Sequence, residues 1–218
     1  MTLEYTFDFL KALAKNNTRE WVQENKKNYT KAKDEFAAFI EQIIQEIAAF
    51  DDSVQGLQPK ECIFRLNRDV RFSKDKSPYK LHFGAAIMEG GRKSPNPTYY
   101  LHIEPGKSFL AGGIYMPEAE SLKKIRQEID YNPSELKDIV SANSFVNTFG
   151  KMTGEQLKTA PKGYPKDHPN IELLRFKSFL ASRELKDAQV LDPGFSSKVI
   201  EDFKVLYPFN RYFAVAIS

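Results

Sequence analysis

The sequence is poor in cysteine: Cys62 is the only one among 218 residues, so the chain cannot form an intramolecular disulfide. Such a composition suits a reducing compartment, and we expect a cytoplasmic protein. Long hydrophobic runs are also missing, because no stretch approaches the roughly 20 consecutive apolar residues that a membrane span needs. Residues 1–5 show neither the basic nor the apolar region of a secretory signal. We therefore expect no membrane partner.

Motifs of several common enzyme classes are absent as well. The chain has no glycine-rich phosphate loop, no dinucleotide-binding fingerprint after a strand, no His-Glu-x-x-His pair and no nucleophile elbow. It has no paired cysteines for structural zinc either. Cys62, at the start of an expected strand, is more typical of a small buried hydrophobic residue than of a nucleophile. The sequence therefore predicts no cofactor, and it does not decide whether the protein is an enzyme.

Apolar residues are plentiful enough to form a core. They make up 41% of the chain and include 17 Phe and 10 Tyr, which can bury enough surface to offset the loss of chain entropy. The length and the lack of a flexible linker predict a single domain over residues 1–218. The oligomeric state is not decided by the sequence.

Helical periodicity dominates the two ends of the chain. A short helix capped by Thr6 is expected first. It is followed by an apolar stripe that predicts one long helix from Thr18 to Ala49, either straight or kinked near Asn28. Six apolar residues form the second half of this stripe: Phe36, Phe39, Ile40, Ile43, Ile44 and Ile47. Later helices are expected over residues 117–129, from 133 onward, and over 196–206.

Strands are expected in the middle of the chain, over residues 62–66, 83–88 and 176–185. The clearest pair is a hairpin of residues 98–104 and 108–115, joined at Pro105-Gly106, which places His102 opposite Phe109. Hairpins between helical ends, rather than alternating strands and helices, predict an α+β fold. In that fold, helical N- and C-terminal parts surround a central, mainly antiparallel sheet.

Positive charge is concentrated in residues 60–80, which we call the basic segment. It holds seven basic and three acidic residues, whereas the remainder of the chain holds 25 basic and 26 acidic ones. A local excess of this kind attracts anions, and Arg in particular binds carboxylate or phosphate through two parallel hydrogen bonds. Asp69 and Asp75 could instead pair with these bases and hold the loop in shape.

The candidate ligand-binding residues combine the basic segment with a hairpin whose missing side chains would let a ligand approach the backbone. They are Arg65, Arg68, Arg71, Lys74, Lys76, Tyr79, Lys80, Gly112 and Gly113. If the site is catalytic, the weak candidates for proton transfer are Tyr79, His82 and His102.

A metal site is a competing interpretation of the histidines. His102 and Glu104 are two apart on a strand and so share a face, and with His82 they could form a set of two imidazoles and one carboxylate. The alternative is that His102 only neighbours Phe109 across the hairpin. Because the sequence does not bring His82 next to His102, we predict no metal. His168, in a polar stretch, is expected to be a surface or a capping residue.

Several short motifs, in chain order, resemble those of a widespread, mostly bacterial family called domain of unknown function 2461. They are residues 16–21 (Asn-Asn-Thr-Arg-Glu-Trp), residues 68–80 within the basic segment, residues 99–103, residues 112–115 and residues 167–177. The resemblance covers nearly the whole chain and implies no particular activity. Its motifs coincide with the basic segment, which makes the residues there candidates for a shared site.

The sequence favours binding, with or without turnover, of an anionic or phosphorylated small molecule at the basic segment. Two alternatives remain open. The arginines and aspartates could form an internal ion-pair network in a structural or protein-interaction protein. The same basic residues, with exposed Tyr and Phe, could bind nucleic acid, which the small total charge makes less favoured.

Overall fold

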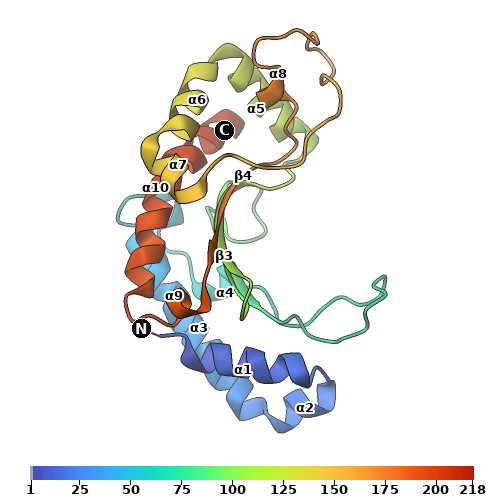
Figure 1. Cartoon of the computed structure of the whole chain (residues 1–218), viewed down its shortest axis with the longest axis vertical. Coiled ribbons are helices and arrows are strands. Elements are labelled where there is room, and N and C mark those ends of the chain that lie inside the picture. Colours follow the sequence, from blue (N-terminus) through green and yellow to red (C-terminus); the bar gives the residue numbers. More distant parts are fainter. Residues whose placement is uncertain (1) are drawn as a thin grey trace. The chain divides into compact units, whose positions relative to one another are not determined.

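The computed structural model describes residues 2–218 and shows an α+β fold, as the sequence predicts. Helices precede and follow a four-stranded antiparallel sheet, and four further helices lie in the chain between its third and fourth strands (Figure 1). The strands are β1 (Phe83–Ile87), β2 (Thr98–Ile103), β3 (Ser108–Ile114) and β4 (Phe179–Leu185), and they lie in the order of the sequence. The helices are α1 (Glu4–Lys15), α2 (Arg19–Glu24), α3 (Lys26–Ile47), the 3-10 helix η1 (Asp52–Val54), α4 (Pro59–Cys62), α5 (Ala119–Tyr131), α6 (Pro133–Ser141), α7 (Asn143–Phe149), α8 (Ile171–Leu174), α9 (Asp187–Val190) and α10 (Phe195–Ile217).

The chain divides into two compact units. The first unit comprises the residues up to Arg92 together with Tyr100–Leu110 and Glu184–Ile200. The second unit comprises Lys93–Tyr99, Ala111–Arg183 and Glu201–Ser218. The division falls within β2, β3, β4 and α10, so these four elements run continuously from one unit into the other.

The core of the first unit is built on the apolar stripe of α3. All six residues of the expected stripe are buried, as the helical spacing predicts. Phe36 contacts Phe83 of β1 with ring centroids 5.4 Å apart, and Phe39 stacks on Phe195 at 5.5 Å. The aromatic residues of the stripe therefore pack on β1 and on the first residue of α10, while its isoleucines are buried in the same core.

The core of the second unit forms where α10 packs on the sheet. Phe203 lies 5.2 Å from Tyr99 of β2, and Phe213 lies 4.9 Å from Phe179 of β4. Between these contacts the buried Asn210 accepts a hydrogen bond from the Gly113 backbone N–H (2.8 Å) and donates one to the Thr98 carbonyl (3.1 Å). One amide side chain thus ties the helix to two neighbouring strands.

The N-terminal helices differ in detail from the expectation. The predicted helix over 18–49 is two helices, because Asn25 has a non-helical backbone and its amide donates to the Trp21 carbonyl. A polar side chain that bonds nearby backbone in this way competes with the helix. Thr6 does not cap α1: its buried hydroxyl donates to the Ala32 carbonyl (3.1 Å), which ties α1 to α3.

The prediction of a strand over residues 62–66 is wrong. Proline at the first position of α4 and the Gln58–Glu61 capping box start a helical turn at Pro59 that ends at Cys62. The chain then touches the sheet only briefly: Ile63 forms an isolated bridge with Ala85, and the Phe64 N–H donates to the Gly84 carbonyl (2.9 Å). Further along, α5 begins after Pro117, and the last helix continues through Pro208 to Ile217.

None of the helices formed by residues 2–218 combines the length and the apolar character that crossing a membrane requires.

Candidate functional site

The basic segment begins within α4 and ends shortly before β1, all in the first unit, and most of it forms a long loop (Figure 1, teal). The base of the loop is closed by backbone hydrogen bonds from Lys80 N–H to the Leu66 carbonyl (2.8 Å) and from Arg68 N–H to the Pro78 carbonyl (2.9 Å). The Asn17 side chain anchors it to the N-terminal helices, because its amide donates to the Tyr79 carbonyl (2.9 Å) and its oxygen accepts from the Tyr79 N–H (3.1 Å). The two ends of the loop are therefore held together, and Asn17 ties its second end to the N-terminal helices.

Arg68 is enclosed by the loop itself. Its guanidinium pairs with Asp75 and donates to the Ser77 hydroxyl (2.5 Å) and the Ser73 hydroxyl (3.3 Å), and its side chain is 25% exposed. The Ser77 hydroxyl and N–H also donate to Asp75, and these bonds, together with Arg68, lower the pKa of Asp75 to about 2. The hydrogen-bond partners of the Arg68 guanidinium thus all come from the loop itself.

Arg71 is also paired, but in solvent. Its guanidinium donates to Asp69 (2.6 Å), which holds the pKa of that carboxyl below its usual value, and the Arg71 side chain is 76% exposed. Lys76 donates to the Val70 carbonyl (3.0 Å), and Phe72 is 96% exposed. Aspartates of the loop therefore pair with two of its arginines, as the ion-pair alternative requires, while Arg71 and Phe72 remain exposed to solvent.

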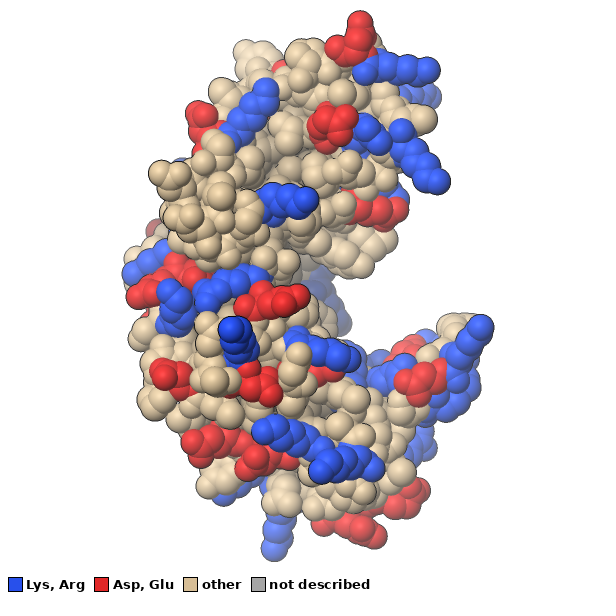
Figure 2. All heavy atoms as spheres, viewed as in Figure 1, with Lys and Arg blue, Asp and Glu red and all other residues tan. Residues whose placement is uncertain are grey.

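Charge of both signs is intermixed on the face shown in Figure 2, and no broad surface of one sign appears there. Within the first unit, however, a pocket of about 510 Å³ lies between α3, α4 and the start of the basic segment. Its apolar lining includes Tyr29, Ile63, Phe64 and Phe83. Its charged lining residues are Lys33, Lys60, Arg65 and Arg92 with one acid, Asp34.

The four cations of this pocket, unlike Arg68 and Arg71, form no ion pair within residues 2–218. The Arg92 guanidinium donates to the Lys60 carbonyl (2.6 Å), which joins the turn after β1 to α4 and holds the Arg92 side chain at the pocket. Of the predicted ligand-binding residues, only Arg65 lines the pocket. Tyr29, Lys33 and Ala37 share a helix face at a spacing of four residues, but nothing in the sequence indicates that α4 faces them.

A second polar cluster lies where β1 begins and β2 ends. His82 precedes β1, whereas His102 lies in β2 and Glu104 follows it, so pairing of the two strands brings the three side chains together. The two imidazole rings lie 4.0 Å apart between centroids, and His102 Nε2 lies 3.1 Å from Glu104 Oε2. His102 also stacks on Phe109 at 4.6 Å, in agreement with the predicted hairpin register.

Burial sets the charge state of this cluster. It lowers the pKa of His82 to about 4, with further lowering from His102 and Lys80, and it also lowers the pKa of His102 against the opposing effect of Glu104. Burial raises the pKa of Tyr100, whose hydroxyl lies 3.1 Å from His102 Nδ1, to about 12. At neutral pH both imidazoles are therefore uncharged, and either could transfer a proton.

Gly112 and Gly113 belong to the second unit, whereas the basic segment belongs to the first. A Cβ on Gly113, which has φ +105°, would lie 2.0 Å from the Phe179 carbonyl oxygen. A Cβ on Gly112 would lie 2.6 Å from Leu206. Close packing of β3 against β4 and α10 therefore accounts for both glycines.

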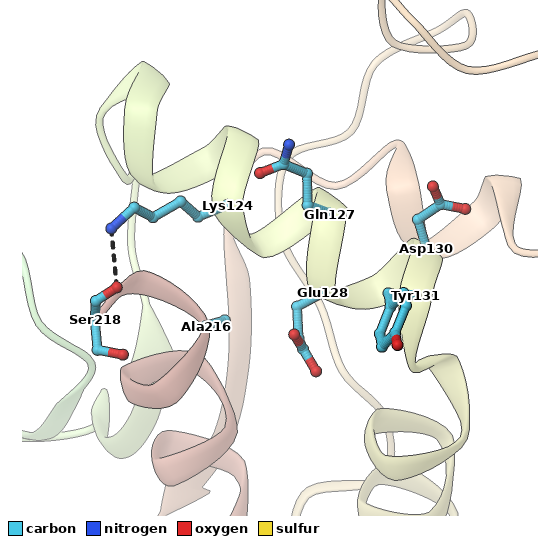
Figure 3. Close-up of a pocket in the computed structure, with 7 residues that line it drawn as sticks. All are labelled: Lys124, Gln127, Glu128, Asp130, Tyr131, Ala216 and Ser218. Carbon is cyan, nitrogen blue, oxygen red and sulfur yellow. Dashed lines mark hydrogen bonds between the residues drawn. The ribbon is translucent and has the colours of Figure 1, made fainter.

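The second unit has a pocket of its own, of about 770 Å³, between α5 and the end of α10 (Figure 3). Its lining mixes Lys124 with Glu128 and Asp130, and Lys124 donates to the Ser218 carbonyl (2.9 Å). With its cation already engaged and two acids beside it, this pocket is less suited to an anion than the one beside Arg65. His168, elsewhere in this unit, bonds Asp130 at 2.9 Å.

Comparison with known proteins identifies one family, described as conserved hypothetical protein (DUF2461), which matches residues 5–212. No curated protein and no solved structure matches the chain.

Proposed function

We infer a function from the premise that this chain belongs to the DUF2461 family of conserved hypothetical proteins, whose description names no reaction. We propose that the protein binds an anionic small molecule with an apolar body, such as an organic phosphate or carboxylate, in the pocket beside Arg65. The observation that carries the proposal is the lining of this pocket, which combines four cations and one acid with apolar side chains. The buried, free Cys62 supports a cytoplasmic location.

The cations supply the recognition of the anion. Arg65 and Arg92 carry planar guanidinium groups that match a phosphate or carboxylate, and Lys33 and Lys60 add point charges. Because none of them forms an ion pair within the described chain, a ligand does not have to displace an internal carboxylate. In this respect the pocket differs from Arg68 and Arg71, whose guanidinium groups already form ion pairs with aspartates.

The apolar residues of the lining supply the rest of the binding energy. Tyr29 and Phe64 offer partly exposed aromatic surface, and a volume of about 510 Å³ falls within the range of roughly 300–1,000 Å³ typical of small-molecule sites. An inorganic anion would leave this surface unused. An organic anion with an aromatic or aliphatic group should therefore bind more tightly than free phosphate.

A second candidate function is a protein-interaction role for the loop around Arg71. The support is specific: Arg68–Asp75 and Arg71–Asp69 pairs hold the loop in shape, and the exposed Phe72 lies beside Arg71, 5.9 Å from its guanidinium carbon. Nucleic-acid binding is less favoured, because two of the loop's three arginines are neutralised by aspartates.

The test is a thermal-denaturation screen at fixed ionic strength with phosphate, sulfate, phenyl phosphate, a sugar phosphate, a nucleotide and a short oligonucleotide. At about 100 times its dissociation constant, a ligand stabilises by roughly 2.7 kcal/mol. For a chain of this size that corresponds to a rise in Tm of about 5–10 °C. We expect phenyl phosphate to produce this shift and inorganic phosphate to produce less.

Charge-reversal variants locate the site. The shift should vanish in Arg65→Glu and Lys33→Glu and persist in Lys158→Glu, an exposed basic residue that does not line the pocket. Equal small shifts for every anion in all of these proteins would show that only screening of like charges is at work. In that case the interaction role of the loop replaces the ligand pocket.

A further inference from the structure

We propose that His82, His102 and Glu104 bind a divalent transition-metal ion, at a site separate from the anion pocket. The observation is geometric: each side chain offers one ligand atom, and these atoms all lie within 4.8 Å of one another. Two imidazoles and one carboxylate are a donor set that binds Zn²⁺ and Fe²⁺ in proteins. The inference does not depend on the function proposed above.

The distances require only a small adjustment. Ligand atoms at about 2.1 Å from one ion lie roughly 3–3.5 Å apart. His102 Nε2 and Glu104 Oε2 are 3.1 Å apart, and His82 Nδ1 lies 3.8 Å from the same oxygen. Metal binding therefore requires the His82 side chain, which precedes β1 rather than lying within it, to move closer to the other two ligands.

The surroundings of His102 hold its ring in a ligating orientation. Phe109 stacks on one side of the ring, and Tyr100 places its hydroxyl 3.1 Å from Nδ1. When Nε2 binds the metal, the Nδ1–H donates to that hydroxyl, which is the outer-sphere hydrogen bond that metal-bound histidines usually make. Gly84 makes room for this tyrosine, because a Cβ there would lie 2.8 Å from the Tyr100 hydroxyl oxygen.

The site is partly sheltered but remains open. The side chains of His102, Glu104 and His82 are 11%, 18% and 25% exposed. Three protein ligands leave further coordination positions for water or for an anionic group of a substrate. Two lysines neighbour the cluster: Lys80 lowers the pKa of both histidines, and Lys107 lies 3.6 Å from Glu104 Oε1. These cations would attract an anion to the open positions.

Ligand chemistry selects the ion. Imidazole suits Zn²⁺, Fe²⁺, Ni²⁺ and Cu²⁺, whereas Mg²⁺ and Ca²⁺ prefer sites made of oxygen ligands. Zn²⁺ is therefore the probe, and Mg²⁺ is the control ion.

The experiment titrates the chelator-stripped full chain with Zn²⁺ by calorimetry. We expect one ion per chain and no binding of Mg²⁺ at the same concentrations. Because second-sphere changes alone weaken a site by about 10- to 100-fold, removing a direct ligand in His82→Gln or Glu104→Gln should weaken it by at least about 100-fold. Tyr100→Phe should fall within the second-sphere range, and His168→Gln, which removes the unrelated pair with Asp130, should change nothing.

A second measurement needs no variant. In ¹⁵N spectra of the histidine rings, Zn²⁺ should move the signals of His82 and His102 and leave those of His168 in place. Failure of Zn²⁺ to bind, equal binding in the ligand variants, or movement of the His168 signals alone would overturn the proposal. In each of these cases the His102–Glu104 hydrogen bond would be a structural contact only.

Discussion

At the residue scale, Asp75 shows how neighbours set the charge of a single group in the basic segment. Donation from Ser77 is the largest cause of its low pKa of about 2, ahead of Arg68. We predict an NMR titration midpoint for the Asp75 carboxyl well below the usual 3.8. Ser77→Ala should raise this midpoint more than Arg68→Gln does. A wild-type midpoint near 3.8 would show that the loop does not hold these bonds in solution.

The sign of the pH effect follows from this shift. Because the pKa of Asp75 is lower in the folded chain than in the unfolded chain, its contribution to stability is present above about pH 4. That contribution is lost as the pH falls towards about 2. Asp75→Asn should remove this part of the acid dependence.

Residue type alone could not separate the arginines of the basic segment. Arg65, Arg68 and Arg71 are equally spaced and equally charged. Yet Arg65 lines the pocket, whereas the guanidinium groups of Arg68 and Arg71 form ion pairs with aspartates. The histidines show the same limit. Side chains two residues apart on a strand point to the same face, so the sequence alone predicts that His102 and Glu104 lie together. His82 joins them only because β1 pairs with β2 in the folded sheet.

At the element scale, the periodicity of α3 was sufficient to predict its buried face. Ile43 is fully buried, so we predict that Ile43→Ala lowers the free energy of unfolding by about 2–5 kcal/mol, the range for a large-to-small change in a core. Chemical denaturation measures it. Glu41→Ala, on the exposed face of the same helix, should cost less than about 0.5 kcal/mol. Equal losses in the two variants would contradict the assignment of the faces.

A second prediction at this scale concerns Asn210, a residue of α10 whose side chain forms hydrogen bonds with the backbone of two strands. Asn210→Leu leaves the Gly113 N–H and the Thr98 carbonyl without this partner. A buried polar group that loses its hydrogen bond costs about 1–3 kcal/mol. We therefore expect a loss of stability of at least that size in a denaturation curve. A neutral substitution would show that water or another group replaces the amide.

Element boundaries were the least predictable part of the fold. The apolar residues from Cys62 to Leu66 are typical of a strand, but the cap formed at Gln58 and Pro59 starts a helical turn instead. The break at Asn25 likewise depends on one local hydrogen bond inside an otherwise regular stripe. Both features arise from competition between short-range interactions that differ little in energy, which periodicity does not measure.

At the scale of the whole molecule, the order of helices and strands was enough to predict the α+β class. The single domain expected from length remains a prediction. Since β2, β3, β4 and α10 each contribute residues to both compact units, neither unit keeps its strands intact without the other. We expect one cooperative unfolding transition, with equal calorimetric and van't Hoff enthalpies. Two resolved transitions would show two independent domains.

The central claim is that the anion binds beside Arg65 rather than in the loop around Arg71, and calorimetric titration of phenyl phosphate tests it most directly. Arg65→Glu and Arg71→Glu change the net charge equally, at exposed positions six residues apart. Loss of a charged hydrogen bond, about 1.5–3 kcal/mol, should weaken binding by roughly 10- to 100-fold in Arg65→Glu. Arg71→Glu should bind within about fivefold of the original chain, since a surface charge of this kind contributes less than about 1 kcal/mol. The reverse order, or an equal loss in both variants, would contradict the claim.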